Sequence, residues 1–128
     1  MTLENIVPSL EDCKRIPQGS FSDSALVWMI SPYQSDKLIV IERWRYGACE
    51  VYPAPTLVEI LAELPTCVEV ESTGRIFYLA MFDTRNKDGM IQFGYTDSYL
   101  TKTKLRERDE NPVAAALRLW FRLKGVQG

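Results

Sequence analysis

The amino-acid sequence predicts an α+β fold of two layers, in which a mainly antiparallel sheet of about four to six strands packs against about three helices. Helix starts with capping signals lie near the beginning, in the middle and near the end of the chain. Short apolar strands lie between these helix starts, and the turns that separate them are of hairpin length, which favours antiparallel pairing. No repeat or long linker divides residues 1–128, so we expect a single α+β domain.

The first element expected is a short helix. Pro8 and Ser9 open this helix, with Ser9 as its N-cap, and Pro17 ends it. The strands expected after it are short and mostly apolar, at residues 25–30 and 37–44, and residues 48–52 form either a third short strand or a continuation of the second around a bulge. Turn-forming residues separate the first two of these strands, which predicts a hairpin.

The helix in the middle of the chain has the clearest local signal. Pro53 and Pro55 hold their neighbours extended. Thr56 and Glu59 then match a capping box, in which each side chain accepts from the backbone N–H of the other residue. Apolar residues recur at helical spacing until Pro65 stops the helix, which predicts an amphipathic helix packed on another element.

The second half of the chain predicts an antiparallel meander followed by a terminal helix. The strands expected lie at residues 66–71, 75–83 and 90–95. Residues 75–83 are apolar on both faces, which predicts a central buried strand, whereas residues 66–71 are apolar on one face only, which predicts a position nearer the edge. Asn111 caps a largely buried helix with Pro112 at its first position, and Gly125 suits the left-handed residue at its end.

The composition excludes most enzyme templates. The chain contains no histidine, which removes Ser-His-Asp triads, Cys-His dyads and histidine-ligated metals. Phosphate-binding glycine loops and nucleophile elbows are absent from the sequence as well. Four acidic residues are candidates for a carboxylate pair or a cation site, but nothing fixes their geometry: Glu42, Glu50, Glu69 and Glu71. We therefore expect no catalytic, cofactor-binding or metal-binding residues and no cofactor, and we keep a small histidine-free enzyme as an alternative.

The cysteines predict neither disulfides nor a metal site. Cys13, Cys49 and Cys67 are widely spaced and odd in number, so each is interpreted as a reduced, buried, small apolar residue. Residues 1–15 lack the pattern of a secretory signal, and no apolar run is long enough to span a membrane. The sequence therefore predicts a cytoplasmic protein without a membrane partner.

A basic segment supports a different functional hypothesis. Lys102, Lys104, Arg106 and Arg108 alternate with other residues, so an extended backbone would point all four cations one way. The net charge is +4 from residue 72 onward and −6 before it, although the whole chain carries only −2. We interpret the segment first as a solvated polar loop, and nucleic-acid binding through these four residues is the alternative.

The aromatic content favours self-association. Periodicity assigns most aromatic residues to the core, including Trp28, Trp44, Trp120 and Tyr78. However, 3 Trp, 6 Tyr and 5 Phe are more than one small core readily hides. An aromatic interface between two copies is therefore expected, since symmetric dimers are the commonest oligomers.

Two segments of the chain resemble a known group of proteins. Residues 52–61 read YPAPTLVEIL and residues 111–120 read NPVAAALRLW. Both are similar to segments of small uncharacterised proteins encoded by phages and prophages of gut bacteria, and residues 8–14 are similar too, so the likeness touches most of the length. The shared motifs are helix starts and packing faces, and Val113 stands where the similar proteins usually have alanine. The resemblance therefore implies a phage or mobile-element origin but assigns no functional residue.

The function expected from these observations is non-catalytic. We expect a phage- or prophage-derived accessory protein, in the cytoplasm of a bacterial host, that binds an unidentified protein and forms a homodimer. We interpret the residues singled out above, among them Thr56 and Trp120, as structural, because they set the direction of the backbone or pack in the core.

Overall fold

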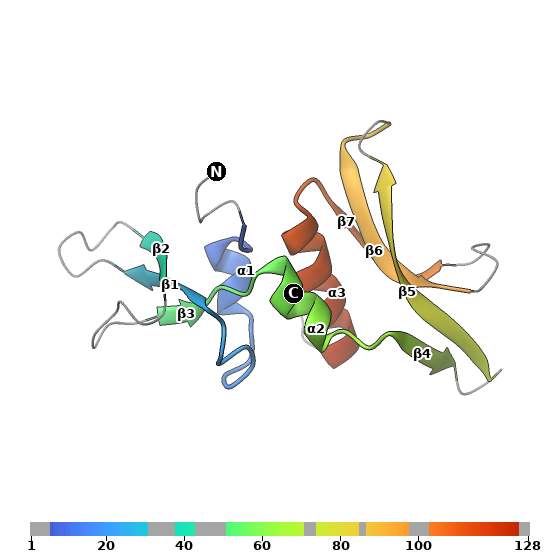
Figure 1. Cartoon of the computed structure of the whole chain (residues 1–128), viewed down its shortest axis with the longest axis horizontal. Coiled ribbons are helices and arrows are strands. Elements are labelled where there is room, and N and C mark those ends of the chain that lie inside the picture. The colour runs from blue at the N-terminus through green and yellow to red at the C-terminus, as the bar shows by residue number, and fades with distance from the viewer. Residues whose placement is uncertain are drawn as a thin grey trace.

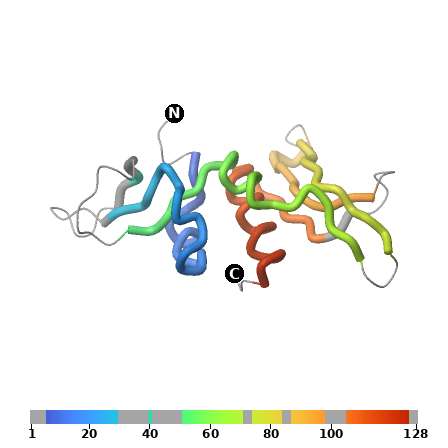
Figure 2. The backbone as a smooth tube through the Cα atoms, turned by 60° about the horizontal axis from the view of Figure 1, so that its bottom comes forward, coloured from blue at the N-terminus to red at the C-terminus, as the bar shows by residue number. Residues whose placement is uncertain are grey.

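The molecule is elongated, with two helices in the middle and one sheet on either side of them (Figure 1). The computed structural model describes residues 6–30, 38–42, 51–70, 74–84, 87–97 and 103–125. The elements in chain order are α1 (Leu10–Lys14), β1 (Leu26–Ile30), β2 (Leu38–Glu42), β3 (Val51–Pro53), α2 (Leu57–Glu63), β4 (Cys67–Val70), β5 (Arg75–Thr84), β6 (Met90–Thr96), β7 (Thr103–Asp109) and α3 (Pro112–Lys124). Figure 2 shows the same elongated arrangement of the backbone from a second direction.

The α+β class is confirmed, and the described strands form two antiparallel sheets where the sequence led us to expect one. The first sheet has the order β2-β1-β3, and the second has the order β4-β5-β6-β7. The break comes at α2, which separates β3 from β4 along the chain. Apolar periodicity reports which face of a strand is buried and not which strand lies beside it, so it does not determine the number of sheets.

Strand β7 replaces the polar loop that the sequence predicts for residues 100–108. Residues 103–109 pair with β6 along its free side, which makes β7 an edge strand. Edge strands in natural proteins carry charged side chains that discourage further pairing, so the Lys and Arg pattern fits this position. Leu105 has a φ of 52°, and the register shifts here because Leu105 and Arg106 together lie opposite Gly94.

The predicted starts of α2 and α3 and the predicted end of α3 are confirmed, whereas α1 ends at Lys14, before the predicted Ile16. The Glu59 N–H donates to Thr56 Oγ1 at 3.4 Å, and the Thr56 N–H donates to Glu59 Oε1 at 2.8 Å, which completes the capping box. The Val113 N–H donates to Asn111 Oδ1 at 2.9 Å at the start of α3. Gly125 ends α3 with a φ of 72°, a conformation that glycine adopts without steric cost.

The core is centred on α3. This helix has eight buried residues between Val113 and Phe121, and it packs against β6, β7 and α2. Phe77, Phe93 and Tyr95 supply buried rings from the sheet. The Tyr95 hydroxyl donates to the Pro65 carbonyl at 2.8 Å, and burial raises the pKa of Tyr95 to about 12.

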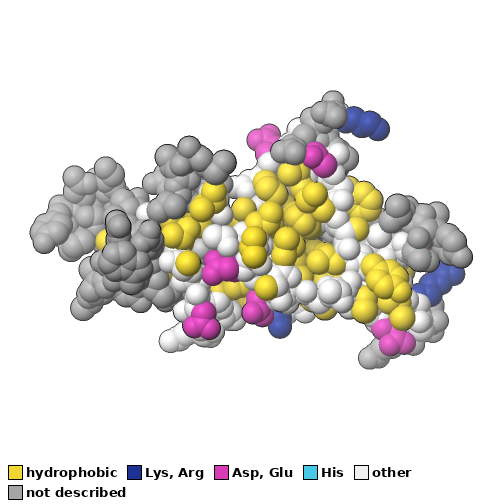
Figure 3. All heavy atoms as spheres, viewed as in Figure 1, with side chains coloured by type: hydrophobic (Ala, Val, Ile, Leu, Met, Phe, Trp, Pro, Cys, Tyr) yellow, Lys and Arg dark blue, Asp and Glu magenta, His cyan; other side chains and the backbone are white. Residues whose placement is uncertain are grey.

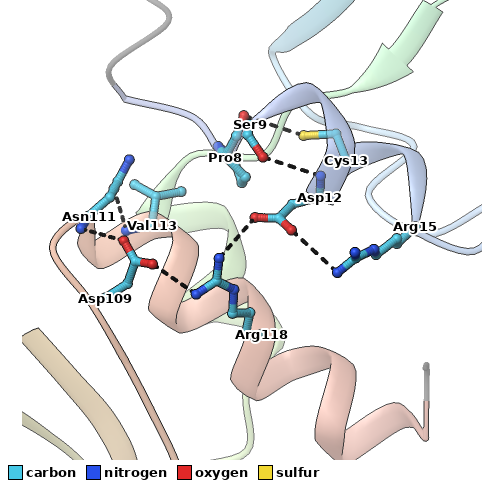
Figure 4. A network of polar contacts seen from close by, with 9 residues as sticks. All are labelled: Pro8, Ser9, Asp12, Cys13, Arg15, Asp109, Asn111, Val113 and Arg118. Carbon is cyan, nitrogen blue, oxygen red and sulfur yellow. Dashed lines mark hydrogen bonds and ion pairs between the residues drawn. The ribbon is translucent and has the colours of Figure 1, made fainter. Parts of the chain in front are cut away.

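Polar contacts connect the N-terminal sheet region to α3 (Figure 4). The carboxylate of Asp12, a buried residue of α1, lies 3.8 Å from Arg118 Nη2 on α3. Arg118 Nη1 also donates to Asp109 Oδ2 at 2.8 Å at the end of β7. Arg118 therefore joins elements that are about a hundred positions apart in the sequence, as Figure 4 shows. Within the described ranges, no helix is both long and apolar enough to cross a membrane.

Candidate functional site

A groove of about 700 Å³ lies between residues 17–24, one side of α2 and the C-terminal end of α3. Its aromatic part is formed by Phe21 and Trp120, whose ring centroids are 4.8 Å apart. A volume of this size is typical of sites that hold a small ligand or a few side chains of a partner. The groove brings together three segments that are distant in the chain, and the sequence analysis did not find it.

The groove is acidic. Asp23, Glu59 and Glu63 line it against a single cation, Lys124. Glu59 is already engaged, because Oε1 serves the capping box and Oε2 accepts from the Ala25 N–H at 3.1 Å. Asp23 and Glu63 are exposed and form no ion pair with any described residue, so their charges face the groove uncompensated. Figure 3 shows the distribution of acidic and basic side chains over the face of the molecule that is seen in Figure 1.

The sequence predicts that Trp120 packs in the core, and the structure shows that it also lines the groove. Its ring is only 3% exposed and packs in the core, yet it also lines the groove. The Nε1–H is buried and donates to no acceptor among the described residues, whereas the Nε1–H of Trp28 donates to the Pro8 carbonyl at 3.0 Å. A buried donor without an acceptor lowers the stability of the folded state. The Nε1–H of Trp120 is such a donor among the described residues.

The loop beside Trp120 is conformationally unusual. Phe21 has a φ of 54°, in the left-handed region that bulky side chains rarely occupy. Its ring packs on the ring of Trp120. The groove wall is therefore ordered around an aromatic pair.

A second surface is the face of the four-stranded sheet that points away from α3, which we call the outer face. Strand register and alternation place six side chains of interest on it: Glu69, Ile76, Tyr78, Phe82, Arg106 and Arg108. Ile76 and Tyr78 are 46% and 48% exposed. The predicted central position of β5 is confirmed, but the prediction that both of its faces are buried is wrong, because α3 covers only the face that carries Phe77.

The structure describes the side chains of two of the four cations in the predicted nucleic-acid segment. Arg106 is exposed, and Arg108 forms an ion pair with Asp88. Lys102 lies outside the described residues, and the backbone of Lys104 pairs with Tyr95. The extra residue at the Leu105 bulge interrupts the backbone register between β6 and β7.

The other candidate residues do not converge on a reactive site. Cys13 is 1% exposed, and burial, with a smaller contribution from the Asp12 carboxylate, raises the pKa of its thiol to about 12, so the thiol is protonated at neutral pH. Cys67 is exposed, so the prediction that it is buried is wrong.

The remaining predicted residues are dispersed or undescribed. Glu69 is exposed on β4, and the backbone of Glu42 pairs with Leu26. Three others lie outside the described residues: Cys49, Glu50 and Glu71. Within the described part of the chain, no three Cys, Asp or Glu residues are arranged to hold a metal ion.

Comparison with known proteins adds no identification. No protein-family model, curated protein or solved structure matches this chain. The resemblance to phage-encoded proteins therefore stays a prediction, and functional inference depends on the two surfaces described above.

Proposed function

We propose that this protein is a non-catalytic accessory protein of phage or prophage origin that acts by binding another protein through its outer face. The observation that carries the proposal is the exposure of Ile76 and Tyr78 in the middle of a sheet face. The helix that packs on this sheet, α3, covers the opposite face, which carries Phe77. A continuous apolar surface with polar borders is typical of protein–protein contacts.

The chemistry of the outer face suits a protein partner. The apolar residues of β5 occupy the centre, with Glu69 on the β4 side and Arg106 on the β7 side. Burial of the central side chains contributes about 25 cal/mol per Å² of apolar area removed from water. The flanking charges contribute less affinity, but they favour one orientation of the partner.

The non-catalytic part of the proposal has separate support. The sequence has no histidine, and the buried thiol of Cys13 stays protonated at neutral pH because its pKa is raised to about 12. A nucleophile needs a base within hydrogen-bonding reach, and the Cys13 Sγ instead donates to the Pro8 carbonyl at 3.7 Å.

The proposal is tested by comparing matched surface variants. Ile76→Glu and Tyr78→Ser alter the outer face, and Val58→Glu changes an apolar side chain that is 77% exposed on α2. Sedimentation equilibrium measures self-association, and mass spectrometry identifies any protein that co-purifies with the wild type. We expect the outer-face variants to weaken the complex at least about tenfold, as at interface positions of high energy, and Val58→Glu to leave it unchanged.

Two results would contradict the proposal. One is a wild-type protein that stays monomeric and retains no protein partner. The other is an equal loss of binding in Val58→Glu and Ile76→Glu, because that would show no preference for the outer face.

Nucleic-acid binding has less support than protein binding. The ion pair of Arg108 with Asp88 offsets one of the cations that the hypothesis needs. A salt-dependent mobility shift that disappears in Arg106→Gln/Arg108→Gln would reverse this ranking.

A further inference from the structure

We infer that the partner of the outer face is a second copy of this chain. In this dimer the two outer faces meet around a two-fold axis, and Glu69 of each copy lies against Arg106 of the other. The inference rests on the proposed function, which assigns protein binding to this face, and adds the identity and the orientation of the partner. It combines the direction of the border side chains, their unpaired charges and the position of Tyr78.

Contacts with the core and with α3 show which border side chains point to the outer face. On β4, Val68 packs against the core, so its neighbour Glu69 points the other way. On β7, Glu107 Oε2 accepts from Arg122 Nη1 of α3 at 3.4 Å, so Arg106 beside it points away from α3. Glu69 and Arg106 are both exposed. The two borders of the outer face therefore carry charges of opposite sign.

These two charges are available to a partner. Glu69 and Arg106 form no ion pair with any described residue, whereas Arg108 on the same face is already paired with Asp88. One exposed ion pair contributes little, but a two-fold axis forms each contact twice. A face with an acidic border, an apolar middle and a basic border is complementary to its own copy. A second copy of the chain thus satisfies both charges.

The strand register gives the positions of the two charges on the face. Glu69 lies opposite Ile76 on β5. Arg106 lies beside Gly94, which is opposite Ala80 on β5. The charges are therefore separated by about 13 Å along the strands and by three strand spacings, about 14 Å, across them. The line that joins them runs diagonally over the sheet.

This diagonal determines how the two copies are oriented. A two-fold axis in the plane of contact exchanges two points only when it bisects the line between them at a right angle. The axis that brings Glu69 onto Arg106 therefore runs at about 45° to the strands. The strands of the two copies then cross at close to a right angle, which is one of the two usual arrangements of sheets packed face to face.

Tyr78 lies beside the same axis. The midpoint between the two charges is at the level of Tyr78, which is halfway between Ile76 and Ala80 along β5. Ile76 and Tyr78 are the exposed apolar residues of this face, so the axis places the ring of Tyr78 close to its counterpart in the other copy. Tyrosine suits such a position because it buries a large area and loses little conformational entropy. The charges and the apolar centre thus select the same arrangement.

The test reverses the two charges separately. In the dimer, Glu69→Arg places two arginines against each other at both contacts, and Arg106→Glu places two glutamates there. We expect each variant alone to dimerise about tenfold more weakly than the wild type in sedimentation equilibrium. An equimolar mixture of the two variants restores opposite charges at both contacts of the heterodimer. We therefore expect the mixture to associate within about twofold of the wild-type affinity.

The matched control is Glu11→Arg, which makes the same change of charge at an exposed residue of α1. Alone, this variant should dimerise as the wild type does. Mixed with Arg106→Glu, it reproduces the net charges of the complementing mixture but leaves one contact with two glutamates. The control mixture should therefore associate about threefold more weakly than the complementing mixture.

Cys67 reports the contact in the wild-type chain. It is exposed and lies opposite Tyr78 in the register, which places it on the outer face. Alkylation of Cys67 by iodoacetamide is measured by mass spectrometry of the peptide that contains it. We expect the rate to fall as the protein concentration rises through the dissociation constant. In Tyr78→Ser the rate should stay nearly independent of concentration over the same range.

Four results would overturn the inference. They are a wild type that stays monomeric, a complementing mixture that associates no better than its two components, a control mixture that associates equally well, and an alkylation rate of Cys67 that does not change as the dimer forms. The proposed function fails separately. A monomeric wild type that retains a different protein, and loses it in Ile76→Glu, would keep the outer face as a binding surface and exclude only the second copy as its partner.

Discussion

The two sheet regions of this protein are held in different ways. The region of β4–β7 is fixed by apolar packing, because α3 buries eight residues and covers one face of the sheet. The region of α1 and β1–β3 also has buried apolar residues, among them Leu26 and Val40, and it adds individual polar contacts. The Pro8 carbonyl accepts from Trp28 Nε1 and Cys13 Sγ, and Asp12 forms an ion pair with Arg118. Apolar packing is spread over many contacts, whereas each polar link depends on one geometry, so the two regions should respond differently to mutation.

The largest effect is expected in the packed region. Leu117→Ala removes a fully buried side chain from α3 and should lower the free energy of unfolding by about 3 kcal/mol, through lost burial and the cavity left behind. Urea denaturation measures the change. Val58→Ala on the exposed side of α2 is the control and should stay within about 0.5 kcal/mol. A loss below about 1 kcal/mol for Leu117→Ala would show that α3 is not the principal packing element.

The polar link between the two regions is expected to contribute less. Arg118→Met removes the contacts to Asp12 and Asp109 and should cost about 1.5 kcal/mol, because among the described residues it leaves the buried Asp12 with Arg15, 3.7 Å away, as its ion-pair partner. Arg122→Met is the matched control on the same helix, where an exposed pair with Glu107 contributes about 0.5 kcal/mol. If chemical denaturation gave the same loss of unfolding free energy for both variants, the contacts of Arg118 would contribute no more to stability than an exposed ion pair.

Alkaline pH should weaken the N-terminal region through Cys13. The pKa of its thiol is about 12 in the folded protein against 9.0 in the unfolded chain, so its stabilising contribution is complete below pH 9 and is lost as the pH rises toward 12. The folded state binds more protons in this window, and the free energy of unfolding falls by about 1.4 kcal/mol per pH unit.

This pH dependence is measured best between pH 9 and 10, below the ordinary pKa of Tyr95, which is 10.0. Cys13→Ala should flatten the slope of stability against pH there, whatever its effect at neutral pH. Cys67→Ala is the matched control for loss of a thiol, since Cys67 is exposed. An unchanged slope in Cys13→Ala would refute the assignment.

The smallest effect concerns the capping box at the start of α2. Thr56→Ala removes the acceptor of the Glu59 N–H and one partner of the Glu59 carboxylate, and should cost about 1 kcal/mol. Thr66→Ala changes an exposed threonine outside any cap and serves as the control. Thermal denaturation compares the stability of the two variants. An equal change in both would show that the capping box does not stabilise α2.

Local signals predicted most of the elements correctly. Thr56 with Glu59, Asn111 with Pro112, and Gly125 each act within a few residues, so the helix ends could be read without knowledge of the fold. Strand β7 was missed because its charged residues suit an edge strand and a polar loop equally well. Tyr78 was assigned to the core because alternation shows that a strand has two apolar faces but not that both are covered.

The groove could not have been predicted from the chain alone. Phe21, Glu63 and Trp120 are far apart in the sequence, and none belongs to a motif with a known spacing. The absence of a hydrogen-bond acceptor for the Trp120 Nε1–H can be seen only when the surrounding atoms are placed.

The sequence by itself determined where most of the helices and strands lie, because capping, proline stiffness and apolar periodicity are local effects. Tertiary structure alone decided that the strands divide into two sheets, that one face of β5 stays open, and that α2, α3 and residues 17–24 enclose an acidic groove. These features depend on contacts between segments far apart in the chain, and such contacts leave no regular spacing in the sequence.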